Sequence, residues 1–195
     1  MTFKTSLTEL LGIRHPILLA PMGAVAGGRL AREVTLAGGL GLVGVGYGGV
    51  DVIQRELDAA EDTQVGIGFI SWDLAREPSR LELALSRGPV LVQLSFGDAA
   101  PYVSRIKGAG AKVALQVQSL ADAQRAAQLG ADVVIAQGTE AGGHGGARAL
   151  FPLLPAIVDA VAPLPVVAAG GISDGSGLLA ALALGLSGPL MGTRF

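Results

Sequence analysis

The sequence predicts an α/β fold of the (β/α)8 TIM-barrel class, and three observations support this prediction. Short apolar runs recur about every 24 residues along the chain. Segments with the apolar spacing of helices lie between these runs. Half of the 195 residues are hydrophobic and only 15% are charged, so a large buried core is available. An open doubly wound sheet is the structural alternative, but such sheets usually have fewer strands and the even spacing does not favour one.

Eight apolar runs are expected to form parallel strands. Each run is four to six residues long and does not alternate strictly, which is typical of strands buried on both faces. Eight strands with seven intervening helices favour a closed barrel. The runs are Ile17–Ala20, Leu40–Val45, Val65–Ile70, Val90–Leu94, Lys112–Val117, Asp132–Ala136, Pro165–Ala169 and Gly188–Met191.

The segments between the strands carry helix signals. Leu30 and Val34 are one helical turn apart. The same spacing separates Ile53 from Leu57 and Leu81 from Leu85. Ser119 and Asp122 resemble a capping box in which Asp replaces the usual Glu. Glycines that stand just before strands are expected at the ends of the helices. These glycines are Gly39, Gly88, Gly110, Gly130 and Gly185.

The chain is expected to form one barrel domain, residues 1–195, truncated after its eighth strand. The sequence ends at Phe195, directly after the eighth expected strand, so we expect it to lack the eighth helix and any C-terminal segment that would cover the barrel. An unclosed barrel exposes apolar surface on its first and eighth strands. We therefore expect poor stability, or self-association through this edge.

Composition excludes several classes of function. A net charge of −2, the lack of a Lys/Arg cluster and 4% aromatic residues argue against nucleic acid and anionic membranes as partners. The absence of cysteine and the presence of only two histidines exclude disulfides, a thiolate nucleophile and a Cys- or His-rich metal site. Two charge-free runs, Val34–Val50 and Gly175–Thr193, are interrupted by glycines or Pro189 and predict helix–strand units rather than membrane spans. We expect a cytoplasmic protein.

A glycine-rich loop after the sixth strand is the best candidate for a catalytic segment. It covers Gly138–Gly146, nine residues of which five are glycine, and loops after strands form the catalytic face of a barrel. His144 is the catalytic candidate because imidazole can accept or donate a proton near neutral pH. The alternative for His144 is a solvent-exposed loop histidine. Glu140 either orients His144, binds substrate or is a solvated charge, whereas His15 precedes the first strand and is expected to be structural.

The ends of the seventh and eighth strands match the phosphate site that is common in barrels. Gly170–Gly171 follow the seventh strand and Met191–Thr193 end the eighth. Backbone N–H groups from both segments can converge on one phosphate, and the Thr193 hydroxyl adds a donor. The alternative for the glycines is a tight turn into a helix capped by Ser173 or Asp174. Both interpretations can hold together.

Further side chains at strand ends could contact a cofactor. Met22, within Pro21–Gly23 after the first strand, could pack against a flat ring, although methionine at such a position is more often part of the core. Gln116 and Gln137 end the fifth and sixth strands, and buried amides need hydrogen-bond partners. A cofactor's polar edge and backbone carbonyls are the two candidate partners.

Taken together, these residues resemble the nitronate monooxygenase family. The likeness runs in order along nearly the whole chain, and Glu-Ala-Gly-Gly-His is its most specific motif. The other pieces are shared with other flavin barrels. The matching segments are His15–Ile17, Pro21–Gly23, Ala37–Gly41, Gly138–His144, Ala168–Ile172 and Met191–Phe195.

The resemblance implies bound flavin mononucleotide (FMN) and oxidation of a nitronate by dioxygen to a carbonyl compound and nitrite. His144 would be the base or hydrogen-bond donor. Gly68 is a departure, because some relatives place an Asn near the cofactor at this position. The implied cofactor contacts are Gly142, Gly143, Gly170, Gly171, Met191, Gly192 and Thr193 around the phosphate, Pro21, Met22 and Gly23 at the ring, and Gln116 and Gln137 as further flavin contacts.

Two other functions are compatible with the same residues. One is a different flavin-barrel reaction, such as reduction of an enoyl thioester by a nicotinamide. The other is a flavin-binding remnant without catalysis. Dehydrogenation of inosine monophosphate by a related barrel uses a Cys, which is absent here.

Overall fold

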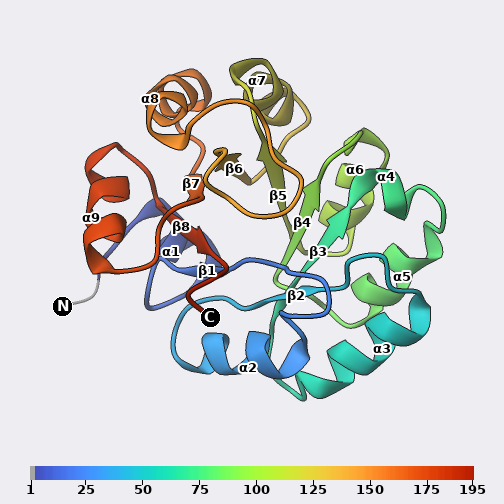
Figure 1. Cartoon of the computed structure of the whole chain (residues 1–195). Coiled ribbons are helices and arrows are strands. Elements are labelled where there is room, and N and C mark those ends of the chain that lie inside the picture. The colour runs from blue at the N-terminus through green and yellow to red at the C-terminus, as the bar shows by residue number, and fades with distance from the viewer. Residues whose placement is uncertain (1–2) are drawn as a thin grey trace. The chain divides into compact units, whose positions relative to one another are not determined.

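A computed structural model describes residues 3–195, in which eight parallel strands alternate with helices (Figure 1). The architecture confirms the predicted (β/α)8 barrel class. Along the sheet the strands follow the order β1-β8-β7-β6-β5-β4-β3-β2. In this order β1 lies next to β8, and every residue of both strands is buried, so the expectation of an exposed apolar edge at these two strands is wrong. They are β1 (Leu18–Leu19), β2 (Leu42–Gly44), β3 (Gly66–Ile70), β4 (Leu91–Ser95), β5 (Lys112–Val117), β6 (Val133–Gln137), β7 (Val166–Ala169) and β8 (Gly188–Met191).

Each strand falls within a predicted apolar run or one residue beyond it. The residues of β6 and β7 are all buried, as expected for parallel strands that are covered on both faces. The burial of consecutive residues explains why these runs lack strict alternation of apolar and polar side chains.

The chain divides into two compact units, which we describe separately. Unit 1 comprises the chain up to Leu18 together with Ala114–Phe195. Unit 2 comprises Leu19–Val113.

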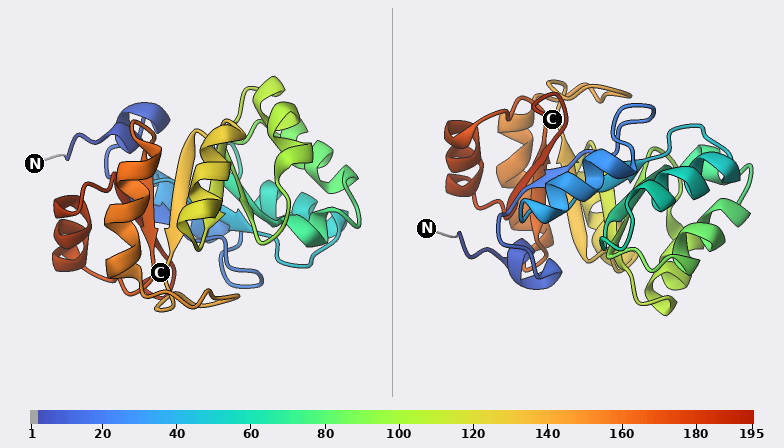
Figure 2. Two further views of the ribbon diagram at one scale, coloured as in Figure 1. Left: turned by 90° about the horizontal axis from the view of Figure 1, so that it is seen from above. Right: turned by 90° about the horizontal axis from the view of Figure 1, so that it is seen from below.

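In unit 1, the strands from β5 to β8 pair in parallel register. Gln137 lies opposite Ala169, and Ala169 lies opposite Leu190, so the carboxyl ends of β6, β7 and β8 are level. Figure 2 shows α1 at one end of these strands and the loop after β6 at the other. The helices of this unit are α1 (Ser6–Leu11), α7 (Leu120–Gln128), α8 (Leu150–Val161) and α9 (Gly175–Ala183).

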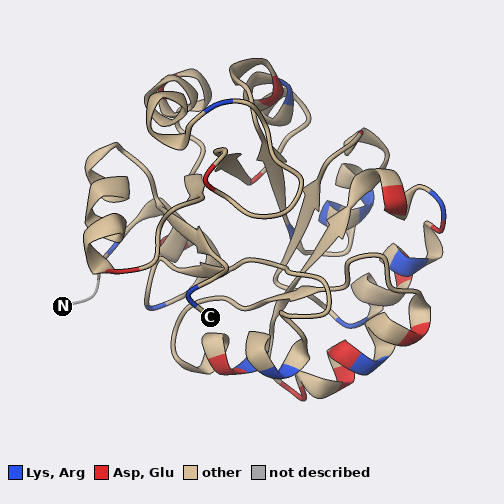
Figure 3. Ribbon diagram, viewed as in Figure 1, with Lys and Arg blue, Asp and Glu red and all other residues tan. Residues whose placement is uncertain are grey.

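In unit 2, β3 pairs with both β2 and β4, and the helices pack on the outside. Charged residues are frequent along α2, α3 and α5, whereas α9 of unit 1 has no charged residue (Figure 3). Arg87 donates a hydrogen bond to Asp58 of α3, and this bond lowers the pKa of the Asp58 carboxyl. The helices are α2 (Gly28–Leu36), α3 (Val50–Ala59), α4 (Ser71–Leu74), α5 (Ser79–Ser86) and α6 (Ala100–Gly108).

The helix ends agree with the sequence signals in most places. The Ser119 hydroxyl accepts a hydrogen bond from the Asp122 backbone N–H at 3.1 Å, which confirms the cap. The Asp122 carboxylate accepts from the same hydroxyl at 2.6 Å, and the shorter Asp side chain thereby replaces the second bond of a capping box. After α2 the left-handed residue is Gly38 rather than Gly39. The other predicted helix-ending glycines all have positive φ: Gly88, Gly110, Gly130 and Gly185.

Two helices, α1 and α4, were not predicted from the sequence. The first, although Leu7, Leu10 and Leu11 have helical spacing, precedes the first expected strand, and the second is a single turn. Across residues 3–195, every helix is too short or too polar to cross a membrane.

Candidate active site

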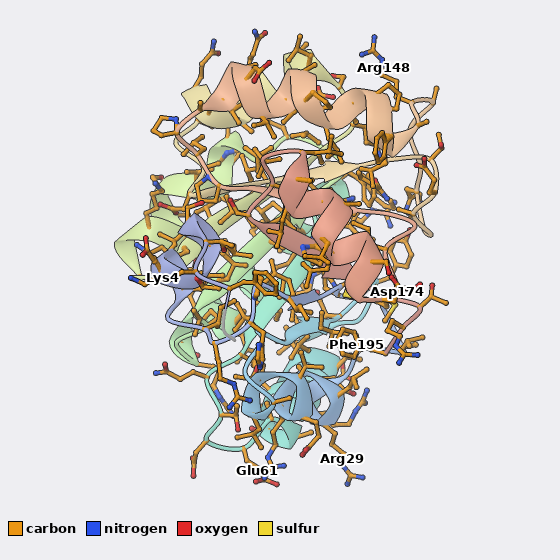
Figure 4. All side chains as sticks on the ribbon, turned by 90° about the vertical axis from the view of Figure 1, so that its left-hand side faces the viewer. Lys4, Arg29, Glu61, Arg148, Asp174 and Phe195 are labelled. Atoms are coloured by element: carbon orange, nitrogen blue, oxygen red, sulfur yellow. The ribbon has the colours of Figure 1, made fainter. Side chains whose placement is uncertain are left out.

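The candidate site of unit 1 is built on the level carboxyl ends of β6, β7 and β8. The segments that follow them start at Gly138, Gly170 and Gly192, so three glycine-containing turns leave the sheet side by side. Figure 4 shows Asp174 and Phe195 on the same side of this unit, opposite Lys4. The site therefore lies at the end of the strands where barrel chemistry takes place.

The loop after β6 is closed at its base by backbone hydrogen bonds. Thr139 N–H donates to the Arg148 carbonyl at 2.9 Å, and Gly138 N–H donates to the Ala169 carbonyl at 3.0 Å. Figure 1 shows the loop crossing in front of the ends of β5 and β6. The loop is thus anchored to the neighbouring strand end and positioned over the sheet.

Two glutamine side chains, Gln118 and Gln137, hydrogen-bond the loop, and Gln116 supports Gln137. Gln137 Oε1 accepts hydrogen bonds from Gln116 Nε2 at 2.9 Å and from Gln118 Nε2 at 2.7 Å. Gln137 Nε2 donates to the Gly142 carbonyl at 3.3 Å, and Gln118 Nε2 also donates to the His144 carbonyl at 3.2 Å. The partners of Gln137 are therefore side-chain amides and a loop carbonyl. Its predicted contact with a cofactor stays a prediction.

Glu140 has a structural role that none of the three sequence interpretations included. Its two carboxylate oxygens lie 3.0 and 2.9 Å from the backbone nitrogen of Leu150, the first residue of α8. The residue before α8, Ala149, cannot cap the helix with its side chain. A carboxylate at a helix N-terminus is stabilised both by the N–H groups and by the helix dipole.

His144 is exposed, at the outer part of the loop. A Cβ atom built on Gly142, Gly143 or Gly145 would meet no atom within 4 Å, so the loop surface around the histidine is open. His15 lies in unit 1 before β1, at the opposite end from this loop, and its Nε2 accepts a hydrogen bond from Arg14 at 3.0 Å.

The glycine pair after β7 packs tightly against the same loop. Gly170 has φ +126° and Gly171 has φ +67°. A Cβ atom on Gly170 would lie 2.8 Å from the Ala141 backbone nitrogen, so a side chain cannot be placed there without moving the loop. Asp174 accepts a hydrogen bond from Gly177 N–H at 2.9 Å and caps α9, as one of the sequence interpretations proposed.

The backbone around this pair fits a phosphate. Within the described part of the chain, the N–H groups of Gly171 and Ile172 donate no hydrogen bond. Consecutive N–H groups in a turn with left-handed residues form a concave anion-binding surface. At the end of β8, Met191 is buried, Gly192 is partly exposed and Thr193 is exposed. The Thr193 hydroxyl is therefore accessible, and its contact with the same phosphate stays a prediction.

In unit 2, the segment Pro21–Gly23 lies against β2 and β3. A Cβ atom on Gly68 would lie 2.3 Å from Pro21 Cγ, and one on Gly44 would lie 2.4 Å from the Met22 nitrogen. This contact gives a physical reason for the glycine at position 68, because Pro21 occupies the space that an Asn side chain would need. The role of the segment at a flavin ring stays a prediction.

Sequence reasoning missed Gln118. It follows β5 directly and is only partly buried, so neither the apolar pattern nor a motif distinguished it from a surface residue. The only available signal was its position at the carboxyl end of a strand, two residues after Gln116.

Comparison with known proteins identifies relatives along the whole chain. The sequence is 40% identical over 200 residues to (3aS,4S,5R,7aS)-5-hydroxy-7a-methyl-1-oxo-octahydro-1H-indene-4-carboxyl-CoA dehydrogenase of Mycobacterium tuberculosis, covering 100% of this chain and 56% of that protein. It is 32% identical to a nitronate monooxygenase of Paraburkholderia phytofirmans, covering 100% of this chain and 66% of that protein.

Among solved structures, the fold matches FabK from Thermotoga maritima with a TM-score of 0.92 and 35% identity. The match covers 99% of this chain and 62% of that chain. The sequence thus spans between about half and two thirds of the length of the relatives it matches. The model of the nitronate monooxygenase family matches residues 4–66 and 70–195, and the chain belongs to this family.

Proposed function

We propose that this chain binds FMN and supports the oxidation of nitronates, or of nitroalkanes, by dioxygen to a carbonyl compound and nitrite. The observation that carries the proposal is the Glu-Ala-Gly-Gly-His loop, which unit 1 holds over level strand ends beside the Gly170–Gly171 pair. Membership of the nitronate monooxygenase family supports the same chemistry.

The FMN phosphate would be held by the backbone N–H groups of Gly171 and Ile172, by Gly192 and by the Thr193 hydroxyl. A Cβ atom on Gly142 or Gly143 would meet no atom within 4 Å, so the backbone of both residues is open to a ligand, and the family resemblance implies that they lie alongside the phosphate. When bound, the flavin supplies the redox step, and the protein supplies binding and orientation.

His144 would move the proton. A nitroalkane must lose a proton from carbon to become a nitronate, and an exposed imidazole can accept it. Gln118 fixes the backbone carbonyl of His144, and Gln137 fixes that of Gly142, so the histidine is presented by a positioned backbone. The nitronate itself is an anion and benefits from nearby N–H donors.

A coenzyme A thioester is the second candidate substrate. The specific observation in its favour is the 40% identity to a carboxyl-CoA dehydrogenase, which exceeds the 32% identity to a nitronate monooxygenase. A nitroalkane and a saturated acyl thioester are both carbon acids that lose a proton next to an electron-withdrawing group on oxidation. An enoyl thioester takes up the corresponding proton when a nicotinamide supplies the hydride, so the same proton-transfer residue and flavin could serve either class.

The proposal predicts that His144→Ala lowers turnover of a nitroalkane by about 100-fold or more, because general base catalysis contributes on this order. Oxygen uptake with a nitroalkane measures the rate. Turnover of the preformed nitronate should fall less, because its proton has already gone. His15→Ala is the control, which should change the melting temperature more than the rate. An unchanged nitroalkane rate in His144→Ala would remove the histidine from this role.

Substrate class is decided by two assays on the same preparation. Oxygen uptake with propionate-3-nitronate tests the first candidate, and oxidation of NADH or NADPH with an enoyl thioester tests the second. We expect oxygen uptake. Nicotinamide oxidation that depends on the thioester, without nitronate turnover, would replace the first candidate with the second.

A further inference from the structure

Unit 2 carries an exposed pair of aromatic rings at the carboxyl ends of two strands. Tyr47 follows β2 and is 58% exposed, and Trp72 lies in α4 directly after β3 and is 39% exposed. Their ring centroids are 5.5 Å apart, with an angle of 41° between the planes. Trp72 is the only tryptophan of the chain, whereas Tyr102, the other tyrosine, is buried.

A guanidinium group completes the surface. Arg76 Cζ lies 5.5 Å from the centroid of the Trp72 ring, within the range of a cation–π contact. The Arg76 side chain is 73% exposed, and its ion pair with Asp73 is long at 3.7 Å. We call Tyr47, Trp72 and Arg76 the aromatic ledge.

A buried arginine fixes the backbone beneath the ledge. Arg80 Nη1 donates to the Gly48 carbonyl at 3.1 Å and to Asp73 Oδ2 at 2.8 Å, with both charged side chains almost fully buried. Arg80 therefore ties the residue after Tyr47 to the residue after Trp72. Such a charge is costly to bury unless its hydrogen bonds are made. Buried hydrogen bonds therefore hold the backbone next to Tyr47 and Trp72, although the two rings are exposed.

The ledge lies next to the segment that is expected to meet the flavin ring. A Cβ atom on Gly23 would lie 2.9 Å from Gly46 Cα, and Gly46 immediately precedes Tyr47. A molecule bound on the ledge could therefore extend toward Pro21–Gly23. This step rests on the proposed binding of FMN and on the family resemblance, which implies the flavin ring at Pro21–Gly23.

We propose that the aromatic ledge is a binding site for the adenine nucleotide part of a redox substrate. An exposed aromatic ring can stack on a purine. The planar guanidinium of Arg76 can bind the phosphate groups through paired hydrogen bonds. Adenosine diphosphate is common to coenzyme A thioesters and to NADH and NADPH, and either source would bring its reactive end toward the ring segment.

Because Trp72 is the only tryptophan, its fluorescence reports directly on the ledge. The full chain is titrated with ADP, with 3′,5′-ADP, which represents coenzyme A, and with 2′,5′-ADP, which represents NADPH. We expect a saturable change in fluorescence for the nucleotides and a weaker effect of adenosine. Tightest binding of 3′,5′-ADP would identify coenzyme A as the source, and tightest binding of ADP or 2′,5′-ADP would identify a nicotinamide nucleotide.

The variant Arg76→Gln should weaken nucleotide binding about fivefold or more, because it removes a charge-assisted contact with the phosphate groups. A fivefold change corresponds to about 1 kcal/mol. Arg29→Gln is the matched control, because Arg29 is an exposed arginine of unit 2 outside the ledge. The absence of a saturable change, or equal affinities in Arg76→Gln and the unchanged chain, would overturn the proposal. The three adenine nucleotides have no redox group, so their binding does not depend on flavin turnover. A chain that binds FMN but none of these nucleotides would overturn this proposal and leave the proposed function intact.

Discussion

Single residues show how sequence patterns can identify a site and still misassign the roles within it. The loop Gly138–Gly146 was identified from its glycines and its histidine, and the structure holds it over the strand ends. Glu140, however, caps α8, and Gln137 supports Gly142. Both side chains serve to place the loop. The sequence pattern shows where polar side chains are concentrated, but their hydrogen-bond partners can be identified only from the structure.

The cap formed by Glu140 gives a prediction at this scale. Glu140→Ala should lower the free energy of unfolding by about 1 kcal/mol, the usual cost of losing an N-terminal cap. Thermal or urea unfolding measures the loss. Glu140→Gln keeps an oxygen acceptor and should lose less. If the alanine variant unfolds like the unchanged chain, the cap contributes nothing measurable.

Elements of secondary structure were the easiest level to predict. Strands such as β6 are buried on both faces, so their residues form uninterrupted apolar runs that the sequence shows directly. Gly130 ends α7 in a left-handed conformation that other residues rarely adopt. The short helix α4 was missed because one turn cannot show a period. Its position depends instead on the buried pair formed by Asp73 and Arg80, which no local pattern reveals.

A second prediction concerns the turn that connects β7 to α9. Gly170→Ala would place Cβ 2.8 Å from the Ala141 nitrogen at a φ of +126°. We expect a loss of about 1–3 kcal/mol in stability, together with weaker FMN retention.

Gly175→Ala is the control for this prediction. Gly175 starts α9, and a Cβ atom there meets no atom within 4 Å. Its stability should be unchanged or slightly raised, since alanine favours helices. Equal melting temperatures for Gly170→Ala and Gly175→Ala would show that the close contact after β7 is not important.

At the scale of the whole molecule, the barrel class and the family followed from the order and spacing of the segments. The likeness to the nitronate monooxygenase family was visible in motifs from His15 to Phe195, and the family match covers nearly all of the chain. The substrate could not be predicted in the same way. The roles proposed for His144 and Gly171 would serve a nitronate or a thioester equally, because they concern the proton and the cofactor rather than the part of the substrate that distinguishes the two classes.

The central claim is that the chain holds FMN by its phosphate at the ends of β7 and β8. The most direct test is the visible absorption spectrum of the purified chain, followed by titration of the flavin-free chain with FMN and with riboflavin, which lacks the phosphate. We predict a yellow protein with one flavin per chain and FMN affinity at least about tenfold above that of riboflavin, a difference of about 1.4 kcal/mol. A colourless protein that cannot be reconstituted, or equal affinity for the two flavins, would contradict the account.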